Sequence, residues 1–80
     1  MTTKKKLLKK FLEKPESLNF RQIERLLKWF GFERIRVTGS HFRFRHREYD
    51  LEFPVPVHDR DCKKWYKKYI SDIFKNNFLI

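Results

Sequence analysis

The chain has 80 residues and a mass of 10.1 kDa, which allows one small hydrophobic core and leaves no room for a second. Its 20 Lys and Arg outnumber its 10 Asp and Glu, and a charge excess of this size can indicate a disordered chain. Disordered chains are poor in aromatic residues, however, and here they make up 18% of the sequence, which favours a folded domain. A single cysteine excludes an internal disulfide, and three scattered histidines exclude a zinc cluster. We therefore expect one folded basic domain over residues 1–80, with no metal and no cofactor.

The first predicted element is an amphipathic helix over residues 4–14, which ends before Pro15. Its apolar residues recur at helical spacing between lysines: Leu7, Leu8, Phe11 and Leu12. Because this stripe is short, we expect it to pack on the rest of the domain rather than on a membrane surface. Lys9 and Lys10 interrupt the apolar stretch, which argues against a signal peptide. No apolar run in the sequence is long enough to span a bilayer. These features predict a cytoplasmic protein without a membrane partner.

The second helix has clear start and stop signals. Asn19 is a good N-cap residue, and Gln22 stands three residues later, as a capping box requires. Gly31 occupies the position where a left-handed residue ends a helix. The residues between them repeat at three and four positions and predict a core face: Phe20, Ile23, Leu27 and Phe30. Trp29 lies off this face, and we expect it to be exposed, as a protein contact or, less favoured, as a residue on which a base stacks.

After this helix the apolar period changes to two, which predicts three antiparallel strands. In the first strand, Glu33, Ile35 and Val37 are expected on one face, with Arg34 and Arg36 on the other. The second strand, residues 41–47, follows a Thr-Gly-Ser turn and has one basic face: His41, Arg43, Arg45 and Arg47. The third strand, residues 51–57, contains two prolines, which cannot donate to a ladder, so it is expected to lie at an edge of the sheet or to leave its outer N–H positions unpaired.

A last helix follows His58, with Asp59 or Asp61 as its expected cap, and continues to residue 76. Its expected buried stripe is Cys62, Tyr66, Tyr69, Ile70 and Ile73, and its expected solvated side is Lys63, Lys64, Lys67 and Lys68. The element order is α-α-β-β-β-α. It predicts an α+β fold in which helices cover one face of a three-stranded antiparallel sheet.

This pattern resembles the HicA family of mRNA interferase toxins from type II toxin–antitoxin systems, which are small basic RNases with a double-stranded-RNA-binding-domain-like fold. The resemblance covers residues 20–76, and the helix at 4–14 looks like an N-terminal extension of longer members. The residues that carry the resemblance are, in chain order, Gly31-Phe32, Gly39-Ser40-His41, Arg45-His46 and Val55-Pro56-Val57-His58. Phe42 stands where members often have a second polar residue, and the strand alternation directs it toward the core.

By this resemblance His41 is the catalytic residue. Histidine suits RNA cleavage because its ordinary pKa of about 6.5 lets it accept or donate a proton near neutrality. Arg43 and Arg45 share its strand face and are expected to hold the phosphate. Without the resemblance, His41 is a surface histidine on a basic strand.

The other two histidines have weaker claims to chemistry. His46 shares a face with Phe42 and Phe44 and is expected to be hydrogen-bonded in the core. His58 precedes a helix N-terminus and is a candidate second acid or base, with a capping or packing role as the alternative. Cys62 falls on an apolar stripe and is expected to be inert. The lysines expected to contact RNA phosphates are Lys63, Lys64 and Lys67.

Together these features predict the toxin of a toxin–antitoxin system, acting as a metal-independent endoribonuclease on mRNA, in which His41 promotes attack by the 2′-hydroxyl. The resemblance implies a HicB-type antitoxin that covers the His41 face in a heteromeric complex. Two alternatives remain. One is a non-catalytic RNA-binding module of the same fold. The other is an adaptor that uses its N-terminal amphipathic helix on a membrane or a protein.

Overall fold

The computed structural model describes residues 4–78. The elements are α1 (Lys4–Glu13), a 3₁₀ turn (Pro15–Ser17), α2 (Phe20–Trp29), β1 (Phe32–Thr38), β2 (His41–His46), β3 (Glu52–Pro56) and α3 (Lys64–Asn77). This order confirms the expected α-α-β-β-β-α arrangement. Within the described range, every helix is too short or too polar to cross a membrane.

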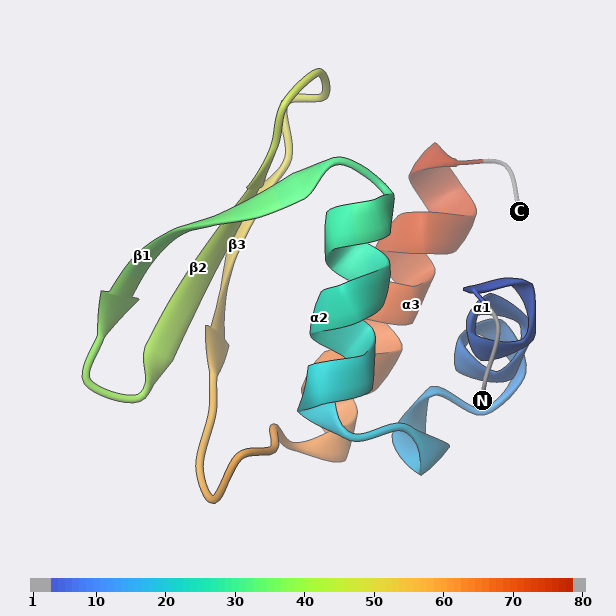
Figure 1. Ribbon diagram of the computed structural model, residues 1–80, viewed down its shortest axis with the longest axis horizontal. Helices are drawn as coiled ribbons and strands as arrows, with labels where there is room; N and C mark the ends of the chain where they lie inside the picture. Colours follow the sequence, from blue (N-terminus) through green and yellow to red (C-terminus); the bar gives the residue numbers. More distant parts are fainter. Residues whose placement is uncertain (1–3, 79–80) are drawn as a thin grey trace.

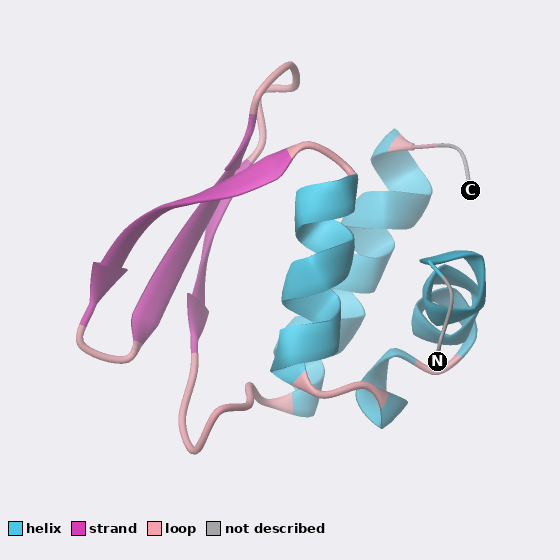
Figure 2. Cartoon of the chain, in the orientation of Figure 1, coloured by secondary structure: helices cyan, strands magenta, loops and turns pink. Residues whose placement is uncertain are grey.

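The elements form three layers (Figure 1). The antiparallel sheet, with strand order β1-β2-β3, is one outer layer, and α2 and α3 cover one of its faces. Helix α1 lies on the far side of α2 and α3 from the sheet (Figure 2). The opposite face of the sheet carries none of the described helices. An open sheet face is therefore available for binding.

Helix α1 packs on the domain, as its short stripe predicted. Leu7 and Phe11 are buried, and the Phe11 ring meets Phe74 of α3 edge-on with centroids 5.4 Å apart. The Ser71 hydroxyl also donates a hydrogen bond of 3.1 Å to the Phe11 carbonyl. The apolar face of α1 is consequently occupied by α3, which argues against a membrane-binding role for it.

The core lies between the sheet and the helices and is built largely from phenylalanine. Helix α2 begins with the expected capping box, since Asn19 and Gln22 each accept a hydrogen bond from the other's backbone N–H. The helix directs its predicted face to the sheet, where Phe20 meets Phe42 edge-on at 5.4 Å. The side chains with less than 2% exposure are Leu7, Phe11, Leu18, Ile23, Leu26, Leu27, Phe44, Val55, Ile70, Ser71 and Phe74.

A β-bulge in β1 overturns part of the expected face assignment. Arg34 pairs with Phe44, whereas Arg36 pairs with Arg43, so Ile35 is the extra residue on the bulged strand. Arg34 therefore lies on the helix side, where it is 3.4 Å from the Glu24 carboxylate of α2. The expectation that Arg34 and Arg36 share a face is wrong, because the extra residue reverses the alternation after it.

Strand β3 is an edge strand, as its prolines predicted. The Val57 N–H donates to the Ser40 carbonyl at 2.6 Å. Because alternate residues of a strand direct their backbone groups to the same neighbour, the odd-numbered residues of this segment are the ones that hydrogen-bond with β2. Pro54 and Pro56 fall at the alternate positions, where the backbone nitrogen faces away from the sheet. The outer edge of β3 thus lacks two donors that a further strand would need.

Two glycines differ in what a side chain would meet, and this difference is testable. Gly31 has φ +96°, and a Cβ built on it would lie 2.8 Å from His46 Nε2; Gly39 has φ +59° with nothing within 4 Å. Gly39→Ala should cost only the left-handed backbone penalty of about 1 kcal/mol. Gly31→Ala adds a clash with a buried ring and should cost about 2–4 kcal/mol. Urea unfolding of both variants measures the difference, and equal losses of stability would contradict the predicted clash between a Cβ at position 31 and the His46 ring.

Candidate nucleic-acid interface

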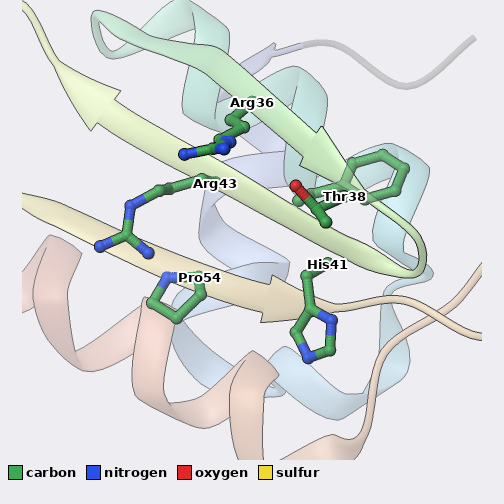
Figure 3. Close-up of a pocket in the computed structure, with 6 residues that line it drawn as sticks. Arg36, Thr38, His41, Arg43 and Pro54 are labelled. Carbon is green, nitrogen blue, oxygen red and sulfur yellow. The ribbon is translucent and has the colours of Figure 1, made fainter.

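A shallow depression of about 410 Å³ lies on the open face of the sheet (Figure 3). It is lined by Arg36, Thr38, His41, Phe42, Arg43 and Pro54. The side chains of Arg36 and Arg43 extend toward one end of the depression, and His41 lies at the other. The surface therefore presents two guanidinium groups and one imidazole without a covering helix.

His41 is positioned by the strands on both sides of it. It is the first residue of β2, directly after the Gly39-Ser40 turn, and pairs with Thr38 on β1 and Pro56 on β3. Directly paired residues share a sheet face, so the imidazole is on the open side. It is exposed, and no hydrogen bond joins it to another residue in the described range. Its ring nitrogens are thus available to a ligand.

The two arginines in the depression differ in their partners. Arg43 Nε donates to the Glu52 carboxylate on β3, which orients the guanidinium across the sheet. Arg36 pairs with Arg43 across β1 and β2, and its guanidinium forms no hydrogen bond or ion pair with the other described residues. Arg36 is therefore the guanidinium more available to an anion. Sequence reasoning missed Arg36 and Thr38 as site residues because no sequence signal marks the bulge that turns Arg36 to the open face.

Arg45, the other predicted phosphate ligand, is outside the lining of the depression. It shares the open face but stands directly between Glu33 on β1 and Glu52 on β3. Of these two neighbouring carboxylates, that of Glu52 is already ion-paired with Arg43, so Glu33 is the one left to offset the charge of Arg45. The electrostatic contribution of Arg45 to anion binding is accordingly expected to be smaller than that of Arg36, which has no acidic residue directly opposite it on β2.

His46 has the structural role predicted for it. Its Nδ1 accepts hydrogen bonds from the backbone N–H groups of Glu48 and Tyr49, at 3.0 and 3.2 Å. Nδ1 is then the unprotonated nitrogen, and Nε2–H donates to the Phe30 carbonyl at 2.5 Å. The buried ring joins the end of α2 to the loop after β2 and faces away from the depression.

His58 lies in a tight turn at the same end of the sheet as His41. Its backbone N–H and carbonyl bond with those of Asp61 at 2.8 and 2.9 Å, and Asp59 and Arg60 both have positive φ, which makes a type I′ turn. The preceding residue, Val57, bonds to Ser40 next to His41. His58 is exposed but does not line the depression.

The start of α3 differs from expectation. Lys63 occupies the N-cap position without a side-chain cap, so the prediction that Asp59 or Asp61 caps this helix is wrong. The Asp61 carboxylate instead accepts hydrogen bonds of 2.9 Å from the backbone N–H groups of Phe20 and Cys62. It therefore ties the beginning of α2 to the segment before α3.

Lys67 was expected on the solvated side of α3, and that expectation is wrong. Its side chain is 6% exposed, and Nζ lies 3.1 Å from Asp61 Oδ2. The buried face of α3 consists of Lys67, Ile70, Ser71 and Phe74, so Tyr69 is exposed instead. Lys67 is unavailable to RNA, whereas Lys63 and Lys64 are exposed as expected.

Cys62 is buried, and burial raises the pKa of its thiol to about 11 despite the nearby Lys67 ammonium. The thiol is therefore protonated near neutral pH, in agreement with the inert role expected for it. In residues 4–78, no group of three or more His, Cys, Asp or Glu side chains is placed to hold a metal ion.

Comparison with known proteins adds one finding. The model of a family described as the HicA toxin of bacterial toxin–antitoxin systems matches residues 20–75. The match runs from the first residue of α2 into the last turn of α3 and leaves α1 outside it. No curated protein and no solved structure matched the chain.

The Asp61 network predicts a pH-dependent stability. Burial alone would raise the pKa of Asp61, but hydrogen bonds from the Cys62 N–H, the Lys67 ammonium and the Phe20 N–H together hold it below its usual range. The stabilisation is therefore complete above the unfolded pKa of about 3.9 and is lost as the pH falls through the lower folded pKa. Asp61→Asn should cost about 1–3 kcal/mol at pH 7, and its deficit should shrink below about pH 4.

Denaturant unfolding of wild type and variant at pH 7 and pH 3 measures this effect. Asp72→Asn is the matched control, because Asp72 is an exposed carboxylate of α3 that forms no hydrogen bond or ion pair with the described residues. It should change stability by less than about 0.5 kcal/mol at either pH. A deficit of Asp61→Asn that is the same at both pH values would refute the proposed linkage.

Proposed function

Because this chain belongs to the HicA family of toxins from bacterial toxin–antitoxin systems, we propose that it is an endoribonuclease that cleaves mRNA, with His41 as its acid–base residue. The observation that carries the proposal is the placement of an exposed imidazole on the same open sheet face as Arg36 and Arg43. That face combines a group able to move a proton with two cations able to bind a phosphodiester.

The proposed chemistry uses the nucleophile that RNA itself carries. His41 accepts the proton of a 2′-hydroxyl, whose oxygen forms a bond to the adjacent phosphorus while the bond from phosphorus to the 5′-oxygen breaks. The products are a 2′,3′-cyclic phosphate and a 5′-hydroxyl end, and the departing oxygen takes up a proton. His58 is the candidate donor, because it is exposed at the His41 end of the sheet.

Arg36 and Arg43 supply the charge that the reaction needs. The phosphate gains negative charge as the 2′-oxygen attacks, and fixed guanidinium groups stabilise that charge. Arg43 is held in orientation by Glu52, and Arg36 has no competing partner among the described residues. The scheme assigns proton transfer and charge stabilisation to side chains, so activity is expected to be independent of added metal.

An antitoxin of the HicB type is the proposed regulatory partner, in a heteromeric cytoplasmic complex. The open face of the sheet is accessible, and the chain carries a net charge of +10. A partner that presents carboxylates to this face would cover His41 and compete with RNA for the same arginines. One surface would then serve both activity and its inhibition.

A non-catalytic RNA-binding module is the second candidate function. One observation favours it: His41 has no hydrogen-bonding partner within the described range that would orient its ring. Many catalytic histidines are oriented by a second group. An open basic face would also bind RNA through phosphate contacts alone. The adaptor alternative is less favoured, because Leu7 and Phe11 of α1 are buried against the domain.

Replacement of His41 separates the enzyme from the binding module. His41→Ala should lower the RNA cleavage rate at least about 100-fold and abolish growth arrest on induced expression. It should leave salt-sensitive RNA binding nearly unchanged, because the arginines remain. Cleavage assays with and without EDTA, alongside growth of cells expressing each protein, measure these effects. Wild-type protein that binds RNA but neither cleaves it nor arrests growth would support the binding module instead.

A comparison of two arginines tests the phosphate site. Arg36→Ala should weaken RNA binding and reduce the magnitude of the salt-dependence slope by about 0.7–0.9, as for the loss of one phosphate contact. Arg45→Ala is the matched control and should have a smaller effect, because Glu33 lies directly opposite Arg45 and Arg45 is outside the lining of the depression. Binding titrations across a series of salt concentrations measure both slopes. An equal or larger effect of Arg45→Ala would contradict this assignment.

A further inference from the structure

Two aromatic side chains on α3 form an exposed stacked pair. Trp65 is 64% exposed and Tyr69 is 41% exposed, although both are large and largely apolar. They lie four residues apart on one helix face, and their rings are parallel within 7° with centroids 5.5 Å apart. Exposed, adjacent aromatic surface of this kind is typical of a binding site. Neither ring belongs to the depression around His41.

The charges around the pair favour nucleic acid as its ligand. Lys64 and Lys68 are exposed and directly precede the two aromatic residues. From residue 63 to the end of α3 the one acidic residue is Asp72, which is exposed three residues after Tyr69, against five lysines. The nearest preceding carboxylate, that of Asp61, is already paired with Lys67. Aromatic rings stack on nucleobases while lysines attract phosphates. In protein–protein interfaces tryptophan is enriched, but lysine is depleted.

The pair lies beside the edge strand that separates it from His41. The Tyr69 ring meets Phe53 of β3 edge-on, with centroids 6.1 Å apart, so the pair packs against β3 at this residue. His41 pairs with Pro56 of the same strand, and its side chain crosses the end of β3 on the open face (Figure 3). His41 and the aromatic pair therefore contact the same edge strand, His41 through Pro56 and the pair through Phe53. RNA that occupies both sites would have to pass over the edge of β3.

We propose that Trp65 and Tyr69 form a stacking platform for an unpaired base of the RNA, close to the phosphate bound at His41. The proposal rests on the proposed function and narrows its substrate class to RNA that is single-stranded at this position. Lys64 and Lys68 hold phosphates next to the stacked base. Recognition by stacking tolerates different bases, because each base has a π face. A base inside a duplex is unavailable to the platform, since its faces are covered by its neighbours in the stack.

The test compares single-stranded and duplex RNA of one sequence, fully 2′-O-methylated so that the 2′-hydroxyl cannot react. Affinities of the full-length protein are measured by fluorescence anisotropy. Trp65→Ala should weaken single-strand binding roughly 5- to 100-fold, as expected for the loss of one base–aromatic stack. Duplex binding should be unchanged. Trp65→Phe retains a ring and should restore most of the affinity.

Trp29→Ala is the matched control. Trp29 is 39% exposed but lies at the end of α2, outside α3 and outside the depression. This variant should bind both RNAs as the wild type does. Unchanged single-strand affinity of Trp65→Ala would overturn the proposal, and so would an equal loss on duplex RNA. Loss of antitoxin binding alone would assign the pair to a protein interface and overturn it as well.

Cleavage of unmethylated RNA by the same proteins distinguishes this proposal from the proposed function. If the wild type cleaves RNA but its affinity for single-stranded RNA does not depend on Trp65, the stacking platform is refuted and the proposed endoribonuclease activity stands. If the affinity for single-stranded RNA depends on Trp65 but the wild type does not cleave RNA, the stacking platform is supported and the proposed endoribonuclease activity is refuted. A wild-type protein that binds neither RNA would overturn both.

Discussion

The Asp61 carboxylate accepts hydrogen bonds from the first residue of α2, from the backbone just before α3 and from the ammonium of Lys67. Lys67 is buried, so this carboxylate also compensates a charge that would otherwise be costly to remove from water. The two helices that support the sheet are thereby joined at the end of the molecule where His41 and His58 lie. The position of the open face relative to α3 depends on this junction.

One face of the sheet forms part of the core, and the other carries the candidate binding residues. The covered face supplies phenylalanines to a core in which most aromatic rings meet at an angle, for example Phe20 with Phe44 and Phe32 with Phe53, while Phe32 and Phe74 are parallel. The open face supplies His41, Arg36 and Arg43 and contributes little to the core. Because neighbouring strand residues alternate between these faces, substitutions on the open face can alter binding without removing core contacts.

Local patterns predicted most of the fold, and non-local pairing explains what they missed. Periodicity, the Asn19 capping box and the prolines of β3 are readable within a few residues, and each element they predicted is present. The bulge at Ile35 depends on how β1 pairs with β2, and the burial of Lys67 depends on a carboxylate six residues away. Hydropathy alone assigns a lysine to solvent and a tyrosine to the core. Lys67 is instead buried in an ion pair with Asp61, and Tyr69 is exposed, so the expected RNA-facing side of α3 keeps Lys63 and Lys64 but loses Lys67.

The proline positions in β3 make the two edges of the sheet unequal. At the β3 edge, Pro54 and Pro56 withhold backbone donors, so an added strand could not complete its ladder there. The β1 edge keeps its donors, but it carries a bulge and the charges of Glu33, Arg34 and Arg36. Self-association through edge-to-edge pairing is thus opposed on both sides by different means. A small basic chain can then present an uncovered sheet face at high concentration without growing into a continuous sheet.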